Sequence, residues 1–341
     1  MTENSTPRQM LKGLLQGIPQ ARPLFLPIVF SLGAKVENLP LREFLGNATK
    51  ISNSLRQIRS HLRSDGVACY FDPYLEAEAL GAKLQWQTGD QFPAIQWPQS
   101  AEKGELPDGL RSPEDAAKSS RVAVAVEAIR RLKSLLRDEA LLLAGVAGPF
   151  TLAARIAGLR KEDAARRENV SDAALELAAA TITQIASKFV EAGANVIFIQ
   201  EDVIPKLSAE DCEAWASLLG PAINIVRFYE ALPVLQILDS RSFAENDRVI
   251  FGQNWDCILC PTLAASAFTA SEMIPQPEFA NRGMALSLAA LQPEASAAEK
   301  FLELLHAFIL KSRPAIVTTA GDAPATTDIK FLARIWEAVR S

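Results

Sequence analysis

The segment EAGANVIFIQED, residues 191–202, carries three structural signals in one short stretch. A helical pattern ends near Gly193, an apolar and β-branched run follows over Asn195–Gln200, and the acidic residues Glu201 and Asp202 close the segment. Short apolar runs bounded by glycine and acidic residues are typical of buried strands in a parallel sheet. The segment therefore predicts a strand that follows a helix and has carboxylates at its carboxyl end.

The same alternation recurs along the whole chain. Strands are predicted at Pro23–Phe30, Val67–Phe71, Leu141–Ala147, Asn195–Gln200, Pro233–Leu238, Val249–Gln253, Met284–Leu288 and Ala315–Thr319. Helices are predicted at Leu41–Arg63, Pro113–Asp138, Ser171–Ala192, Ser208–Ala231, Ala264–Met273, Ala295–Lys311 and Thr327–Arg340, with Ser171 and Ser208 as N-caps. Eight strands that alternate with helices favour a closed (β/α)₈ barrel over an open sheet. We therefore predict a single TIM-barrel domain over residues 1–341.

Two segments fit this pattern less simply. Asp239–Arg248 leaves little room for a helix before the predicted sixth strand, so an alternative places that strand at Cys257–Cys260 with Phe243–Gln253 as the crossover. Leu84–Ser112 is rich in proline and aromatic residues and is predicted to be an insert after the second strand. We expect this insert to form a lid or hairpin over the barrel mouth.

Charge and hydropathy exclude two classes of partner. The chain has 35 basic and 40 acidic side chains, a net charge of −5 and no long basic block, so nucleic acid is not an expected partner. The longest apolar run, Leu141–Ala154, is interrupted by glycine and proline and is shorter than the ~20 residues that a membrane-spanning helix needs. Without a secretory signal pattern, and with four cysteines expected to be reduced, the chain is predicted to be cytoplasmic.

Acidic and amide side chains follow the predicted strands. Only two histidines, His61 and His306, occur, so a carboxylate is the expected acid or base. Active sites of TIM barrels lie at the carboxyl ends of the strands. The alternative reading of each acidic residue is an N-cap for the next helix. The candidates at these ends are Asp72, Glu201, Asp202, Asp239, Asn254 and Asp322.

Three segments resemble one known family. FDPYLEAEALG (71–81), AGPFTLAARIAG (147–158) and EAGANVIFIQED (191–202) are similar to the uroporphyrinogen decarboxylase superfamily. This superfamily includes corrinoid-dependent methyltransferases, and its fold is a TIM barrel that often forms homodimers. The resemblance implies that Asp72 contacts the N–H groups of a substrate ring and that Glu201 is the second catalytic carboxylate.

The chain departs from the decarboxylases of this superfamily in two places. They have an arginine-rich segment after the first strand that holds the carboxylates of the porphyrinogen, whereas this chain reads LPIVFSLGAKVEN (26–38) and offers only Lys35. They also have a histidine in the last loop, where this chain has Gly321. These departures argue against uroporphyrinogen decarboxylation as the main activity. Decarboxylation of a porphyrinogen or of another carboxylate, a lyase activity, is an alternative function.

The chain also departs from the thiol-methylating branch, which binds zinc through a His-x-Cys pair and a further cysteine. At the matching positions this chain has Gln236, Leu238 and Gly321, and the lone pair Cys257 and Cys260 does not complete a site. No metal is therefore predicted.

A zinc-free member of this branch needs an acceptor other than a thiol. The resemblance thus implies transfer of a methyl group between methylcobalamin, presented by a corrinoid-binding protein, and tetrahydrofolate. The proposed catalytic residues are Asp72 and Glu201, and the proposed substrate-binding residues are Asp202, Gln236, Asp239, Asn254, Arg155 and Asp322. Arg155 is included because it can meet a carboxylate such as a glutamate tail. A non-catalytic barrel that binds a corrinoid protein or a tetrapyrrole is the third alternative.

Overall fold

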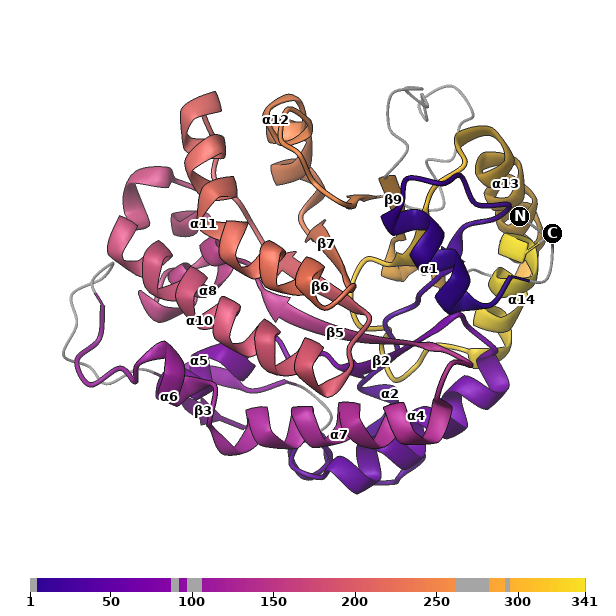
Figure 1. Ribbon diagram of the computed structural model, residues 1–341, viewed down its shortest axis with the longest axis horizontal. Helices are drawn as coiled ribbons and strands as arrows, with labels where there is room; N and C mark the ends of the chain where they lie inside the picture. The colour runs from indigo at the N-terminus through magenta and orange to yellow at the C-terminus, as the bar shows by residue number, and fades with distance from the viewer. Residues whose placement is uncertain (1–4, 87–91, 97–105, 262–281, 292–294, 341) are drawn as a thin grey trace.

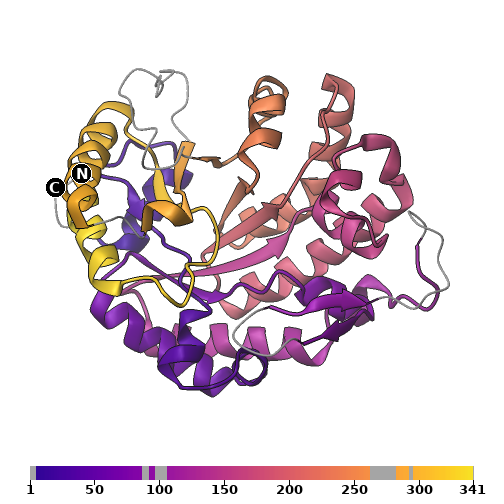
Figure 2. The same cartoon turned by 180° about the vertical axis from the view of Figure 1, so that it is seen from behind.

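The computed structural model describes residues 5–86, 92–96, 106–261, 282–291 and 295–340. Its eight main strands are all parallel, with the spatial order β1-β10-β9-β8-β7-β6-β5-β2, and helices surround them (Figures 1 and 2). The predicted (β/α)₈ barrel is confirmed. The strands are β1 Leu24–Phe25, β2 Gly66–Tyr70, β5 Leu141–Ala147, β6 Val196–Glu201, β7 Leu232–Ile237, β8 Ile258–Pro261, β9 Arg282–Leu286 and β10 Ile316–Thr319.

Helices occupy the connections between the strands. The longer ones are α1 Pro7–Leu15, α4 Ala48–Leu62, α7 Ser120–Leu136, α8 Pro149–Ile156, α10 Asp172–Ala192, α11 Ala209–Phe228, α12 Ser240–Phe251, α13 Ala295–Ser312 and α14 Ile329–Arg340. Shorter ones are α2 Leu32–Val36, α3 Leu41–Leu45, α5 Leu75–Leu80, α6 Pro113–Ala116 and α9 Lys161–Ala164, with 3₁₀ turns at Arg167–Asn169 and Leu288–Leu291. No helix in the described part of the chain combines the length and apolar composition needed to cross a bilayer.

Serine caps begin two of the long helices, as predicted. The Ser171 hydroxyl accepts a hydrogen bond from the Ala174 N–H at the start of α10. Ser208 and Asp211 form a reciprocal capping box at the start of α11. Each cap satisfies an amide that would otherwise lack a partner in the first helical turn.

The sixth strand lies where the alternative assignment placed it. The prediction of a strand at Val249–Gln253 is wrong because most of this segment is the last turn of α12, and β8 begins only at Ile258. Asp239 caps α12 by accepting from the Ser242 N–H at 2.7 Å, so the crossover helix begins directly after β7. The helix predicted at Ala264–Met273 lies outside the described residues.

The insert after β2 contains an antiparallel hairpin, β3 Lys83–Gln85 paired with β4 Ala94–Gln96. Phe92, just before β4, lines a cavity at the carboxyl end of the barrel. The described part of the insert therefore reaches the barrel mouth.

Asp65 closes the barrel between β1 and β2, the two ends of the strand order. Its amide donates to the Phe25 carbonyl at 3.1 Å, and its carboxylate accepts from the Phe25 N–H at 2.9 Å. Arg22 binds both oxygens of the same carboxylate, at 2.6 and 2.9 Å. Because β1 has only two residues, this side chain supplies contacts that a longer strand would make through its backbone.

We expect Asp65→Ala to lower the free energy of unfolding by about 3–5 kcal/mol, because it leaves the Arg22 guanidinium and the Phe25 amide without their buried partner. Urea denaturation measures this. The control is Asp138→Ala, which removes an exposed ion pair with Arg8 and should cost less than about 1 kcal/mol. Equal losses in the two variants would show that Asp65 does not close the barrel.

Candidate functional site

A cavity of about 240 Å³ lies where β2, β5, β6, β7 and β10 end. This is the end of the barrel at which TIM-barrel enzymes place their active sites. The lining residues come from the strand ends, from the loops that follow them, from α8 and from the hairpin. They are Phe71, Asp72, Pro73, Phe92, Gly145, Val146, Ala147, Arg155, Gln200, Asp202, Leu238, Gly321 and Asp322.

Asp72 belongs to the lining of this cavity, and its carboxylate is fully covered by the protein. One oxygen accepts from the Tyr74 N–H at 3.0 Å, and the other forms an ion pair with Arg121 of α7, which also pairs with Glu78. Burial raises the pKa of Asp72 above its ordinary value, although the Arg121 guanidinium opposes the shift. Sequence reasoning missed Arg121, since nothing in the pattern of α7 shows that it faces the site.

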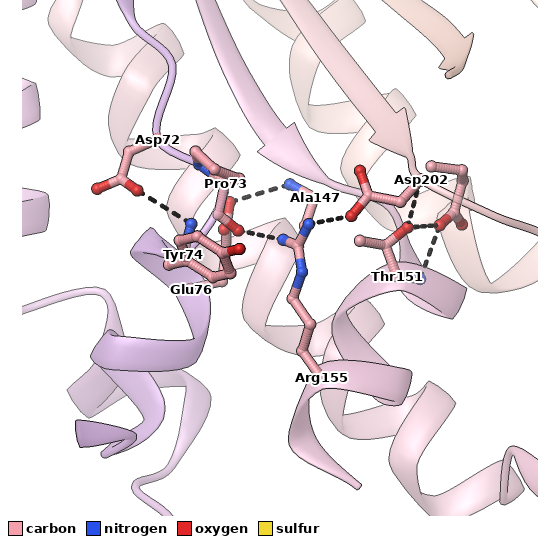
Figure 3. A network of polar contacts seen from close by, with 9 residues as sticks. Asp72, Pro73, Tyr74, Glu76, Ala147, Thr151, Arg155 and Asp202 are labelled. Atoms are coloured by element: carbon pink, nitrogen blue, oxygen red, sulfur yellow. Dashed lines mark hydrogen bonds and ion pairs between the residues drawn. The ribbon is translucent and has the colours of Figure 1, made fainter. Parts of the chain in front are cut away.

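Arg155 of α8 spans the cavity wall (Figure 3). Its guanidinium donates to the Pro73 carbonyl, pairs with the Asp202 carboxylate and lies over the Tyr74 ring, 5.2 Å from the ring centroid. The structure thus brings Arg155, Asp72 and Asp202 to one cavity. The arginine is already engaged by the protein.

Gln200 is a cavity residue that sequence reasoning missed. Its Nε2 donates to Gln236 Oε1 at 2.8 Å, and Gln236 Nε2 donates to the Thr319 carbonyl at 2.9 Å. Gln236 is buried and does not belong to the cavity lining. Side chains alternate between the two faces of a strand, and Gln200 shares the inward face of β6 with Phe198, which packs against Phe71. The alternation was visible in the sequence, but it does not tell which face points inward.

Glu201 points the other way, out of the barrel. Its carboxylate accepts from the Phe150 N–H, the Thr151 N–H and the Thr151 hydroxyl at 3.1, 2.8 and 2.6 Å, and from the Trp215 indole at 3.2 Å. Burial raises the pKa of Glu201 to about 7 even with these donors. Glu201 therefore caps α8 and does not line the cavity beside Asp72.

Gly148 makes this arrangement possible. A Cβ at this position would overlap the Glu201 carboxyl group, so the close approach of β6 to the start of α8 requires glycine. Pro149 follows as the first residue of α8, where its missing N–H is not needed. The GPFT motif is therefore explained by the packing of Glu201.

Asp322 and Asp239 serve as acceptors for backbone amides. Asp322 accepts from the Phe30 and Ser31 N–H groups at 2.7 and 2.9 Å just before α2 while also lining the cavity. Burial raises its pKa to about 6. Asp239 caps α12, pairs with Lys161 at 2.9 Å and is not part of the cavity lining.

Asn254 requires a correction. It was expected to follow the sixth strand, but it lies in the loop between α12 and β8 and is exposed. Because it precedes β8, it lies toward the amino ends of the strands, away from the cavity. The error follows directly from the wrong strand at Val249–Gln253.

Glu76 is a buried carboxyl group that sequence reasoning also missed. Its Oε1 accepts from the Ala147 N–H at 3.0 Å (Figure 3), and its Oε2 has no hydrogen-bond partner among the described residues. Burial raises the pKa of Glu76 to about 7. Its place within FDPYLEAEALG was visible in the sequence, but a glutamate in a short helical pattern is more often exposed.

The residues present do not fit the zinc site of the thiol-methylating branch. Both ends of the Gln236 amide are used in hydrogen bonds, and Leu238 and Gly321 offer no ligand side chain. His61 lies on α4 and His306 on α13. Across the parts of the chain that the structure describes, no three His, Cys, Asp or Glu side chains form a metal-binding group.

The cavity also lacks the basic lining that a polycarboxylate needs. Lys35 donates to the Ala325 carbonyl at 3.1 Å and does not belong to the cavity lining. Arg155 is the one basic residue among the lining residues that the structure describes, against the acidic residues Asp72, Asp202 and Asp322.

Comparisons with known proteins identify relatives of the chain. The family model of uroporphyrinogen decarboxylase (URO-D) matches residues 7–223. The methylcobamide:CoM methyltransferase MtaA of Methanosarcina barkeri is 25% identical over 140 residues, 39% of this chain and 40% of the relative. The match thus spans less than half the length of this curated relative.

Solved structures match over a larger part of the chain. A methyltransferase from Methanosarcina mazei superposes with a TM-score of 0.74 at 16% identity and covers 98% of both chains. A putative vitamin-B12 independent methionine synthase from Listeria monocytogenes gives a TM-score of 0.54 at 11% identity and covers 94% of this chain and 97% of that one. At these identities the matches establish the fold.

We expect Glu76→Gln to change how stability depends on pH. The folded protein holds a proton on Glu76 up to about pH 7, whereas the unfolded chain releases it near pH 4.5, so the free energy of unfolding falls as pH rises between these values. Glutamine does not titrate, so the variant should gain roughly 2–3 kcal/mol relative to wild type between pH 5 and pH 8. Urea denaturation at both pH values tests this, with the exposed Glu176→Gln as control. If the free energy of unfolding depends on pH in the same way in wild type and in Glu76→Gln, the raised pKa of Glu76 is contradicted.

Proposed function

The chain belongs to the uroporphyrinogen decarboxylase family, as its motifs predicted, and from this premise we propose that it is a corrinoid-dependent methyltransferase. The proposed reaction moves a methyl group between methylcobalamin, held by a corrinoid-binding protein, and a nitrogen acceptor, with tetrahydrofolate as the first candidate. The partial match to MtaA and the fold shared with the Methanosarcina mazei methyltransferase support this branch of the family.

One observation carries the choice of acceptor: the described lining has three acidic residues against one arginine, and each of these four side chains already has a partner within the protein. Such a lining suits a ligand that presents N–H groups, because carboxylate oxygens only accept hydrogen bonds when ionised. It does not suit a substrate with several carboxylates. The zinc-binding side chains that activate a thiol are also replaced, at Gln236, Leu238 and Gly321.

In the proposed mechanism Asp72 accepts a hydrogen bond from a ring N–H and orients the acceptor. The lone pair of the acceptor nitrogen forms the new N–C bond while the cobalt–carbon bond breaks and its electron pair stays with the corrinoid. The nitrogen then releases its proton to a cavity carboxylate, for which Asp72 is suited because burial raises its pKa. The main contribution of the barrel is to hold the two substrates in line.

Glu201 acts in this proposal by positioning and not by touching the substrate. Its carboxylate holds the first turn of α8, and the Thr151 hydroxyl that it binds also accepts from the Asp202 N–H at 2.7 Å. Through α8 it also locates Arg155. With Arg155 occupied by Asp202 and Pro73, a glutamate tail would bind there only by displacing Asp202.

The proposal includes two macromolecular partners. The corrinoid is delivered by a separate corrinoid-binding protein, which docks at the barrel mouth. A second copy of the chain forms the homodimer, as in many members of the family. The alternatives are decarboxylation of a porphyrinogen and corrinoid binding without catalysis. An assay of methyl transfer distinguishes the proposed function from both.

We expect the purified protein to convert methylcobalamin and tetrahydrofolate to 5-methyltetrahydrofolate, measured by mass spectrometry, and Asp72→Asn to slow this at least about tenfold, or ~1.4 kcal/mol. The asparagine keeps the volume but replaces an acceptor oxygen with a donor. Asp138→Asn, on the exposed surface, serves as the control. Absence of product with the wild type, or an unchanged rate in Asp72→Asn, would refute the folate proposal.

We also expect the purified protein to hold no stoichiometric zinc, since the ligand positions carry Gln236, Leu238 and Gly321. Elemental analysis of protein prepared without chelator measures this. About one zinc per chain would contradict the prediction and would favour a thiol acceptor.

A further inference from the structure

The polar groups of the cavity are mostly hydrogen-bond acceptors. Asp202 and Asp322 present carboxylates, the carboxylate of Asp72 is covered and paired with Arg121, and Arg155 is engaged by the Pro73 carbonyl and by Asp202. The remaining polar side chain of the described lining is Gln200, whose amide has a donor end and an acceptor end. The orientation of the Gln200 amide therefore decides whether this residue accepts a hydrogen bond from the ligand or donates one to it.

The neighbours of Gln200 determine this orientation. The Thr319 carbonyl can only accept, so Gln236 must direct Nε2 toward it, at 2.9 Å. The other end of the Gln236 amide, Oε1, then faces Gln200 and can only accept. Gln200 must therefore direct its own Nε2 toward Gln236, at 2.8 Å.

This relay leaves Gln200 Oε1 on the cavity side. The oxygen lies 3.2 Å from the position that a Cβ on Gly145 would occupy, and Gly145 lines the same cavity. Rotating either amide by 180° would bring two oxygens or two N–H groups together in a buried place, which costs about 1–3 kcal/mol for each unpaired group. The Thr319 carbonyl on β10 thus determines, through Gln236 on β7, the orientation of the Gln200 amide on β6.

We infer that Gln200 is a specificity-determining residue that accepts a hydrogen bond from a ring N–H of the acceptor, and that Gln236 is the positioning residue that keeps this end of Gln200 toward the ligand. The inference deepens the proposed function, since it names the substrate class as a nitrogen ring that donates N–H bonds. A ring of the same shape with an unprotonated nitrogen at that point would place two acceptors against each other.

Two pterins test the inference by equilibrium binding in a calorimeter. 6,7-Dimethyl-5,6,7,8-tetrahydropterin has N–H groups at ring positions 5 and 8, whereas 6,7-dimethylpterin has acceptor nitrogens there. The wild type should bind the tetrahydro form at least tenfold more tightly. Gln200→Leu and Gln236→Met should each reduce this preference to about threefold or less.

The ratio of the two affinities is informative because general loss of packing would weaken both ligands together. Gln57→Met, on the exposed face of α4, is the matched control and should keep the wild-type ratio. Thermal unfolding confirms that each variant is folded. If either variant fails to fold, the wild-type ratio and the remaining variant still decide the question.

Absence of tetrahydropterin binding to the wild type, equal affinity for the two pterins, or an unchanged ratio in the folded variants would overturn the inference. Failure of the proposed function is recognised separately. If the wild type discriminates the two pterins as expected but forms no methylated product, the inference about Gln200 stands and the proposed methyl transfer is refuted.

Discussion

Glu201 joins β6 to α8 and α11 through hydrogen bonds from Phe150, Thr151 and Trp215, and the cavity wall depends on this junction. A carboxylate at a helix N-terminus satisfies amides that lack partners within the helix and interacts favourably with the helix dipole. The junction locates the first turn of α8 against the end of β6. The junction positions Asp202, whose amide donates to the Thr151 hydroxyl, and Arg155, which lies about one helical turn after Thr151.

The strand alternation at the end of β6 separates two roles in adjacent residues. Glu201 faces outward and holds the helix, whereas Gln200 faces inward and meets the cavity. The same division occurs after β2, where Asp72 lines the cavity and Glu76, on α5, binds the Ala147 amide at the end of β5. In both places a buried carboxyl group outside the cavity supports the carboxylates or amides within it. This organisation matches the general need for a supporting shell behind a preorganised site.

The barrel was predictable from the sequence because the strand and helix signals repeat with turn residues between them. The prediction failed at Val249–Gln253, where an apolar run too short to show a clear period belongs to a helix. The misplaced Asn254 followed from it. Of the two positions predicted for the sixth strand, the alternative at Cys257–Cys260 agrees with the structure, because it leaves room for α12 in the crossover.

The candidate site was predictable only in part. The positions of Asp72, Asp202, Arg155 and Asp322 at the cavity agree with their places after the strands. Glu201 was expected to be catalytic and Asp239 to bind substrate, yet the carboxylates of both cap helices. The sequence cannot separate this role from catalysis without knowing which way each side chain points. Arg121 and Gln200 were missed for the same reason. Tertiary packing determines both the contact of Arg121 with Asp72 and the direction of the Gln200 side chain.

A crystal structure of the protein with tetrahydrofolate tests the central claim most directly, namely that the cavity at the carboxyl end of the barrel reads N–H groups of the methyl acceptor. The account predicts the pterin ring inside this cavity, with ring N–H groups within about 3 Å of an Asp72 oxygen and of Gln200 Oε1. A pterin bound elsewhere, or one that turns its unprotonated edge toward these two residues, would contradict it.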